Sequence, residues 1–153
     1  MIRTLTATHL HRFMNSGRTH PMLCGCEDEA GGWAGDYVVK LRGSMERGDA
    51  RALCELIGAI LAREFGLSAP EPALVLIEEQ FAEQVAAFVP LHATRVRKSA
   101  GLNFGCLLLT DVMGWPVDKS IPDAMRQSAV NIFAFDDVTC HSIPPPNGRF
   151  FSE

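Results

Sequence analysis

The spacing of apolar residues changes several times along the chain, and each change predicts a different element. Apolar and polar residues alternate over residues 5–10, which is typical of a strand with one buried face. A second extended run covers residues 22–24, and β-branched and aromatic residues gather at 37–41. The glycine-rich stretch 27–35 between these runs indicates a hairpin loop. The first part of the chain is therefore predicted to be a set of short strands.

A helical spacing replaces this pattern between Asp49 and Gly66 and predicts a helix over residues 50–65. Apolar residues recur every three or four positions and form one face: Leu53, Leu56, Ile57, Ile60 and Leu61. Asp49 suits the N-cap position and Gly66 the position just after the last turn. Pro70 and Pro72 exclude any continuation of the helix, because each lacks a backbone donor.

The second half of the chain repeats this order of strand and helix. The run 73–77 is continuously apolar and predicts a strand buried on both faces, and 104–110 predicts a further strand. Residues 79–90 suggest a short helix that runs into an extended stretch. A second clear helix is expected over about 122–135, and 137–153 reads as a loop or tail. This order predicts an α+β fold, an antiparallel sheet packed with helices, in a single domain over 1–153.

Composition and charge narrow the class of protein without naming a function. The chain has 153 residues, 47% hydrophobic and 21% charged, which is ordinary for one globular domain. Its formal net charge of −4 argues against direct nucleic-acid or anionic-membrane binding. The five cysteines are an odd number, and no apolar run is long enough for an export signal or a membrane span. We therefore expect a cytoplasmic protein in a reducing compartment.

Four segments, taken together in this order and spacing, resemble a known family. They are Ser16-Gly17-Arg18-Thr19-His20-Pro21, the strand run 37–41, the stretch 55–72 and Gly101-Leu102-Asn103-Phe104-Gly105. They are similar to the amino-terminal part of the HipA-like kinase family, over about residues 15–136. The resemblance implies a core like the amino-terminal lobe of a kinase, followed by a helix.

The resemblance also assigns roles to two residues. Lys40 takes the place of the strand lysine that holds nucleotide phosphates, and Glu55 that of the helix carboxylate that fixes this lysine. Without the resemblance, Lys40 would be read as a residue at a strand edge and Glu55 as a solvated helix residue. By the same comparison the catalytic aspartate falls near Ile143, which accepts no proton, and Asn147 lies beside the place of a metal-binding asparagine. The sequence therefore predicts that the chain is not an enzyme.

The favoured interpretation is a non-catalytic protein-binding module. A lobe that lacks its catalytic partner lobe is expected to leave apolar surface bare around 122–135, and a homodimer or another protein would cover it. The predicted partner-binding residues are Met125, Ala129, Ile132, Phe133, Trp115, Arg95 and Arg97. By analogy with small inhibitors of phages and mobile elements, including anti-CRISPR proteins, the partner is expected to be a bacterial nuclease or effector complex. The alternative is a pseudokinase that still binds nucleotide through Lys40 and Glu55.

Two groups of potential metal ligands occur in the sequence, and each has a simpler explanation. His20, Cys24 and Cys26 lie within seven residues, but a single C-x-C pair without a second pair is a weak zinc signal. Strand cysteines are more often small buried hydrophobic residues. His9 and His11 are expected on one strand face as a polar edge. We therefore expect no metal and no cofactor. The cluster of Arg95, Arg97 and Lys98 reads as a solvated loop or as a contact for an acidic patch of a partner.

Overall fold

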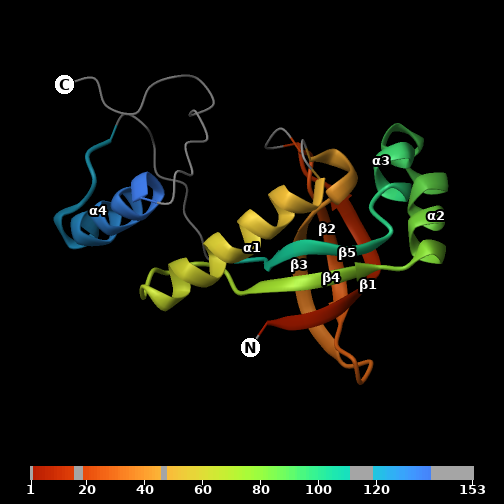
Figure 1. The fold of residues 1–153 in the computed structure, drawn as a ribbon, viewed down its shortest axis with the longest axis horizontal. Helices are drawn as coiled ribbons and strands as arrows, with labels where there is room; N and C mark the ends of the chain where they lie inside the picture. The colour runs from red at the N-terminus through yellow and green to blue at the C-terminus, as the bar shows by residue number, and fades with distance from the viewer. Residues whose placement is uncertain (1, 16–18, 46–47, 111–118, 139–153) are drawn as a thin grey trace.

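Within the described residues, five strands close into a small barrel in the order β1-β2-β3-β5-β4 (Figure 1). The computed structural model describes residues 2–15, 19–45, 48–110 and 119–138. The strands are β1 (Arg3–Phe13), β2 (Met22–Glu27), β3 (Trp33–Lys40), β4 (Pro72–Ile77) and β5 (Gly101–Leu107). All five were expected, although β1 and β3 are longer than predicted and β5 begins and ends earlier. The predicted α+β class is confirmed.

The closure of the sheet depends on one pairing that the sequence pattern did not predict. Four of the strand pairs are antiparallel, whereas β1 and β4 pair in parallel, from Arg3 opposite Ala73 to Thr6 opposite Leu76. This parallel pair joins the first strand to a strand far along the chain. It removes the free edges that an open antiparallel sheet would leave. The family resemblance began after β1, yet β1 supplies a wall of the barrel.

The barrel interior is filled by alternate residues of each strand. Large side chains such as Tyr37, Met22 and Leu5 are fully buried there, together with Cys24 and Cys26. In β4 the alternation is also visible, because Ala73, Val75 and Ile77 are buried while Leu74 and Leu76 are only partly covered. The expectation of a strand buried on both faces therefore holds fully for one face and only in part for the other. One face of β4 lines the barrel, and the other receives a helix that covers it incompletely.

The long helix α1 (Gly48–Glu64) lies across the outside of the barrel, along β4 and β5 (Figure 1). It ends as predicted, because Gly66 has a φ of +73° and the amide of Leu67 donates to the carbonyl of Ala62. Asp49 lies in the first turn rather than at the N-cap, where its charge still favours the helix dipole. The helix α4 (Asp123–Val138) was also predicted and lies beyond the end of α1. There the rings of Phe65 and Phe135 meet with centroids 6.1 Å apart.

The connection between β4 and β5 was predicted only in its first part, the short helix that opens residues 79–90. Residues 78–100 form α2 (Glu79–Phe88), the 3₁₀ turn η2 (Pro90–His92) and α3 (Ala93–Arg97), without the expected extended stretch or solvated loop. The two helices lie side by side at one end of the barrel (Figure 1). Val85 of α2 and Val96 of α3 are buried in the same core as the strands. Tertiary burial of these apolar residues therefore determines a conformation that the short local pattern leaves open. None of the helices in the described ranges is long and apolar enough to cross a membrane.

Candidate functional site

Lys40 and Glu55 form an ion pair between β3 and α1. Lys40 is the last residue of β3, and its Nζ lies 2.8 Å from Oε2 of Glu55 in the first half of α1. The side chains are 30% and 15% exposed, so both are largely shielded from solvent. Arg51, one turn earlier in α1, approaches the other oxygen of Glu55 at 3.4 Å. The structure thus brings together the two residues that the resemblance had singled out, and Glu55 is not the solvated helix residue of the simpler reading.

The aromatic ring of Phe104 lies against the Lys40 ammonium. The sequence did not predict this contact. The Lys40 ammonium lies 5.7 Å from the centroid of the Phe104 ring, a cation–π distance. The two residues are backbone partners in the β3–β5 pair, and Phe104 is buried. The sequence predicted both strands but not that they pair with each other. Only a known register, however, places one particular aromatic residue under the lysine.

An open cleft of about 250 Å³ lies beside this ion pair. Its wall on α1 is made of small residues, Gly58, Ala59 and Ala62, which leave room between the helix and the barrel. The other lining residues besides Lys40 and Glu55 are Ala69, Pro70, Phe104, Cys106, Phe135 and Asp136. The lining is therefore mostly apolar, with one cation and two carboxylates. Such a cleft suits a ligand that has a flat apolar part and a charged part.

Cys106 is the one nucleophilic side chain among these lining residues. Burial raises the pKa of its thiol, and this outweighs the opposing effect of the nearby Lys40 charge. The thiol is therefore protonated at neutral pH and a poor nucleophile. Its role in the cleft is to contribute a small apolar surface next to Lys40.

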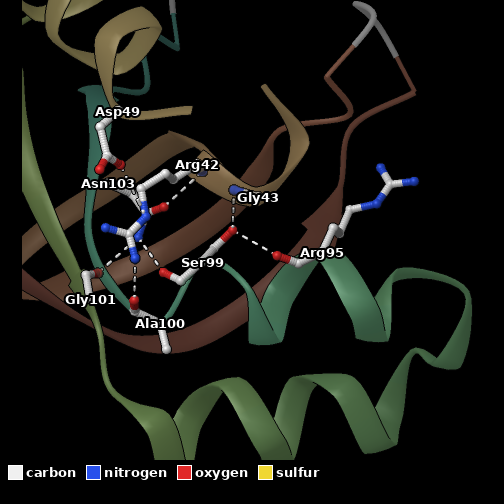
Figure 2. Close-up of polar contacts among 8 residues, drawn as sticks. All are labelled: Arg42, Gly43, Asp49, Arg95, Ser99, Ala100, Gly101 and Asn103. Atoms are coloured by element: carbon white, nitrogen blue, oxygen red, sulfur yellow. Dashed lines mark hydrogen bonds and ion pairs between the residues drawn. The ribbon is translucent and has the colours of Figure 1, made fainter. Parts of the chain in front are cut away.

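The predicted partner-binding residues do not form one surface. Met125, Ile132 and Phe133 are exposed on α4, and Ala129 is partly covered. Arg95 and Arg97 belong to α3, at the opposite end of the molecule from α4 (Figure 1). Arg97 forms an exposed ion pair with Glu83 at 2.9 Å, whereas the Arg95 side chain points away from the polar contacts around it (Figure 2). Trp115 lies outside the described residues.

The potential metal ligands fall into separate groups in the fold, and His9 and His11 lie together on β1 with ring centroids 5.0 Å apart, as expected for one strand face. Cys24 and Cys26 are buried inside the barrel, and burial raises the pKa of Cys26 to about 12. His20 instead stacks near His92, with ring centroids 6.3 Å apart. His11 pairs with Asp36 at 2.8 Å on the outer surface. In the part of the chain that the structure describes, no group of three or more such side chains is placed to hold a metal ion. Ile143 and Asn147 lie outside the described residues.

A five-stranded lobe in which a strand lysine pairs with a helix glutamate has the arrangement found in the nucleotide-binding lobe of protein kinases. The comparison with protein families agrees with this class. The chain belongs to the HipA-like kinase family, whose profile matches residues 8–138. The resemblance found in the sequence is thereby confirmed over most of the chain. Comparison with curated proteins and with solved structures gave no match.

Proposed function

We propose that this chain binds a nucleoside di- or triphosphate in the cleft beside Lys40, with the Lys40 ammonium as a ligand of the phosphates. The observation that carries the proposal is the 2.8 Å contact between Lys40 and Glu55. In kinases this pair must be in place before the lysine can hold the phosphates. Because the pair is formed here, the Lys40 ammonium is held in a defined position at the cleft.

The surroundings of the pair support an anionic ligand with an apolar part. Arg51 helps to neutralise Glu55 from the side away from Lys40, which leaves more of the Lys40 charge for a ligand. The apolar lining from Ala59, Ala62 and Phe104 matches the flat face of a nucleobase. The carboxylate of Asp136 also lines the cleft and disfavours a bare anion there. A bound nucleotide is therefore expected to bring a divalent cation with its phosphates.

The same proposal includes binding without phosphoryl transfer. Transfer needs a base that accepts the proton of the substrate hydroxyl and residues that hold the metal ions. By the family resemblance, the aspartate base is expected near Ile143, which accepts no proton, and Asn147 lies near but not on the place of the metal-binding asparagine. We therefore expect nucleotide to be bound and released unchanged.

Isothermal titration of the full chain with ADP and ATP, each with and without Mg²⁺, tests the proposal. Lys40→Met removes the ammonium and keeps the length of the side chain, and it should weaken ADP affinity by about tenfold or more. Lys119→Met is the matched control, because Lys119 is exposed and does not line the cleft. If the wild-type chain binds neither nucleotide, or if Lys40→Met binds ADP as tightly as wild type, the proposal is wrong.

A second candidate is a non-catalytic protein-binding module, favoured by the bare apolar surface of two helices. Leu53 of α1 is 55% exposed, and Phe65, the residue after its end, is 72% exposed. Met125 and Ile132 of α4 are 51% and 44% exposed. Clusters of this kind often mark protein interfaces. The partner that would cover this surface stays a prediction. It is either a second copy of the chain or a bacterial nuclease or effector complex that the protein would inhibit.

Light scattering after size exclusion tests the homodimer within this second candidate. A dimer that Met125→Ser with Ile132→Ser converts to monomer would support an interface on α4. Ala124→Ser is the control on the same helix, since Ala124 is exposed and outside the predicted interface. A wild-type chain that stays monomeric over the whole concentration range would exclude the homodimer.

A further inference from the structure

Arg42, Ser99 and Asn103 form a polar network (Figure 2). Arg42 follows Lys40 by two residues in the chain. Ser99 and Asn103 are the polar residues that are fully buried among those the structure describes. Arg42 begins η1 (Arg42–Ser44), the short turn between β3 and α1. The network therefore connects η1, which lies between Lys40 and Glu55 in the chain, to the segment between α3 and β5.

Asn103 uses both ends of its amide. Its Oδ1 accepts from the backbone N–H of Arg42 at 2.9 Å. Its Nδ2 donates to the carbonyls of Ser99 at 2.7 Å and Gly101 at 2.8 Å. A buried side chain with three hydrogen bonds in defined directions restrains each backbone segment that it touches. Asn103 thus attaches η1 to the turn before β5.

Ser99 holds the next residue of the same turn. Its hydroxyl oxygen accepts from the backbone N–H of Gly43 at 2.9 Å, and its hydroxyl donates to the carbonyl of Arg95 at 2.7 Å. The approach is close, because a Cβ on Gly43 would lie 2.6 Å from the Arg95 carbonyl oxygen. Any side chain at position 43 would therefore push η1 away from α3.

Arg42 extends the network to the first turn of α1. Its Nη2 donates to the carbonyl of Ala100 at 2.8 Å, and its Nε lies 3.4 Å from Oδ1 of Asp49. Asp49 stands less than two turns before Glu55 on the same helix. One guanidinium thus touches both the α3–β5 turn and the helix that carries Glu55.

The two faces of β5 complete the connection. Neighbouring residues of a strand point to opposite faces. Phe104 contacts the Lys40 side chain, and its neighbour Asn103 accepts a hydrogen bond from the backbone N–H of Arg42, two residues after Lys40. We propose that the Arg42–Ser99–Asn103 network is a positioning device that sets the geometry of the Lys40–Glu55 pair. Its effect on ligand affinity rests on the nucleotide binding proposed above. The α2–α3 segment would then serve as the support against which η1 is held.

A double-mutant cycle on the ion pair tests this proposal without any nucleotide. Unfolding in urea gives the coupling between Lys40→Met and Glu55→Gln in the wild-type background and again with Ser99→Ala. We expect the coupling, expressed as a ratio of unfolding constants, to fall by about threefold or more when Ser99 is replaced. Thr94→Ala is the matched control, because it removes a hydroxyl from an exposed position of α3, the helix directly before Ser99. It should leave the coupling unchanged.

The alternative role is purely structural, and the cycle separates the two. If the network only stabilises the fold, Ser99→Ala lowers the stability of all four proteins equally and the coupling stays the same, which would overturn the proposal. If Ser99→Ala does not fold, Asn103→Asp replaces it, since it keeps the acceptor for Arg42 and loses the two amide bonds. With Asn103→Asp, a lowered coupling supports the proposal and an unchanged coupling overturns it.

ADP titration adds a readout that links the network to the cleft. Ser99→Ala should weaken ADP binding in the wild-type background and have no effect when Lys40 is already methionine, because the network acts through Lys40. A loss of the same size in both backgrounds would overturn the proposal. If ADP does not bind at all, the proposed function fails, and the urea cycle alone decides whether the network positions the ion pair.

Discussion

Replacing Tyr37 with phenylalanine should stabilise this protein, although Tyr37 is fully buried in the barrel. Its hydroxyl has no hydrogen-bond partner among the described residues. A buried polar group without a partner costs about 1–3 kcal/mol, whereas the ring packing is identical in phenylalanine. The small gap left by the missing oxygen offsets part of this gain. We therefore expect Tyr37→Phe to increase the free energy of unfolding by about 1–2 kcal/mol at neutral pH.

The same substitution should change how stability depends on pH. Burial raises the pKa of Tyr37 above its ordinary value of 10.0, and the negative charge of Glu71 adds to the shift. Below pH 10.0 the phenol is neutral in both the folded and the unfolded state, so its titration does not affect stability. Above this pH the unfolded chain loses the proton first, and the folded state loses about 1.4 kcal/mol per pH unit until its own pKa is reached. The Tyr37→Phe protein should not show this loss of stability above pH 10.0.

Urea unfolding followed by circular dichroism, at neutral pH and at a series of alkaline pH values, measures both effects. Tyr37 is the chain's single tyrosine, so the ultraviolet absorbance of tyrosinate reports this residue alone. Buried cysteines also titrate at alkaline pH, but they are common to both proteins and cancel in the comparison. A Tyr37→Phe protein that is less stable than wild type at neutral pH would refute the reasoning, as would an identical alkaline slope.

Two further predictions concern the barrel interior. Because burial raises the pKa of Cys26 to about 12 and also raises that of Cys24, iodoacetamide at about pH 8 should modify the exposed Cys54 in the native protein and spare both barrel cysteines. Peptide mass spectrometry checks this, and rapid native labelling of Cys24 would contradict it. Gly105→Ala should lower the free energy of unfolding by about 1–3 kcal/mol, because its Cβ would lie 2.7 Å from Cγ2 of Val75. Thermal unfolding measures the loss, which Val75→Ala should partly reverse.

The elements with strong local signals could be predicted from the sequence. The helix 50–65 has a long apolar face and a glycine stop, and it appears as α1 with nearly the same bounds. Residues 37–40 of the β-branched run form the end of β3, and the second helix appears as α4. The family resemblance indicated Lys40 and Glu55, because the motifs around them preserve the order and spacing of strand and helix. These features depend on contacts between residues close in the chain.

The segment 78–100 was predicted only in part, as its first short helix, for the opposite reason. It holds two short helices and a 3₁₀ turn, and helices of this length are marginal without tertiary support. Val96 is fully buried against strands that are distant in sequence, and that burial selects the helix. The same holds for Ser99 and Asn103, which look like ordinary polar residues of a loop until the structure places Arg42 beside them.

By itself, the sequence determined which residues form the main strands and helices, the family to which the chain belongs and the two residues of the ion pair. The tertiary structure decided how these parts meet: the parallel pairing of β1 with β4 that closes the barrel, Phe104 under Lys40, and the buried network behind the pair. The physical reason is the range of the forces. Periodicity and capping act within a few residues, whereas register and burial join residues tens of positions apart, and only the complete fold satisfies them together.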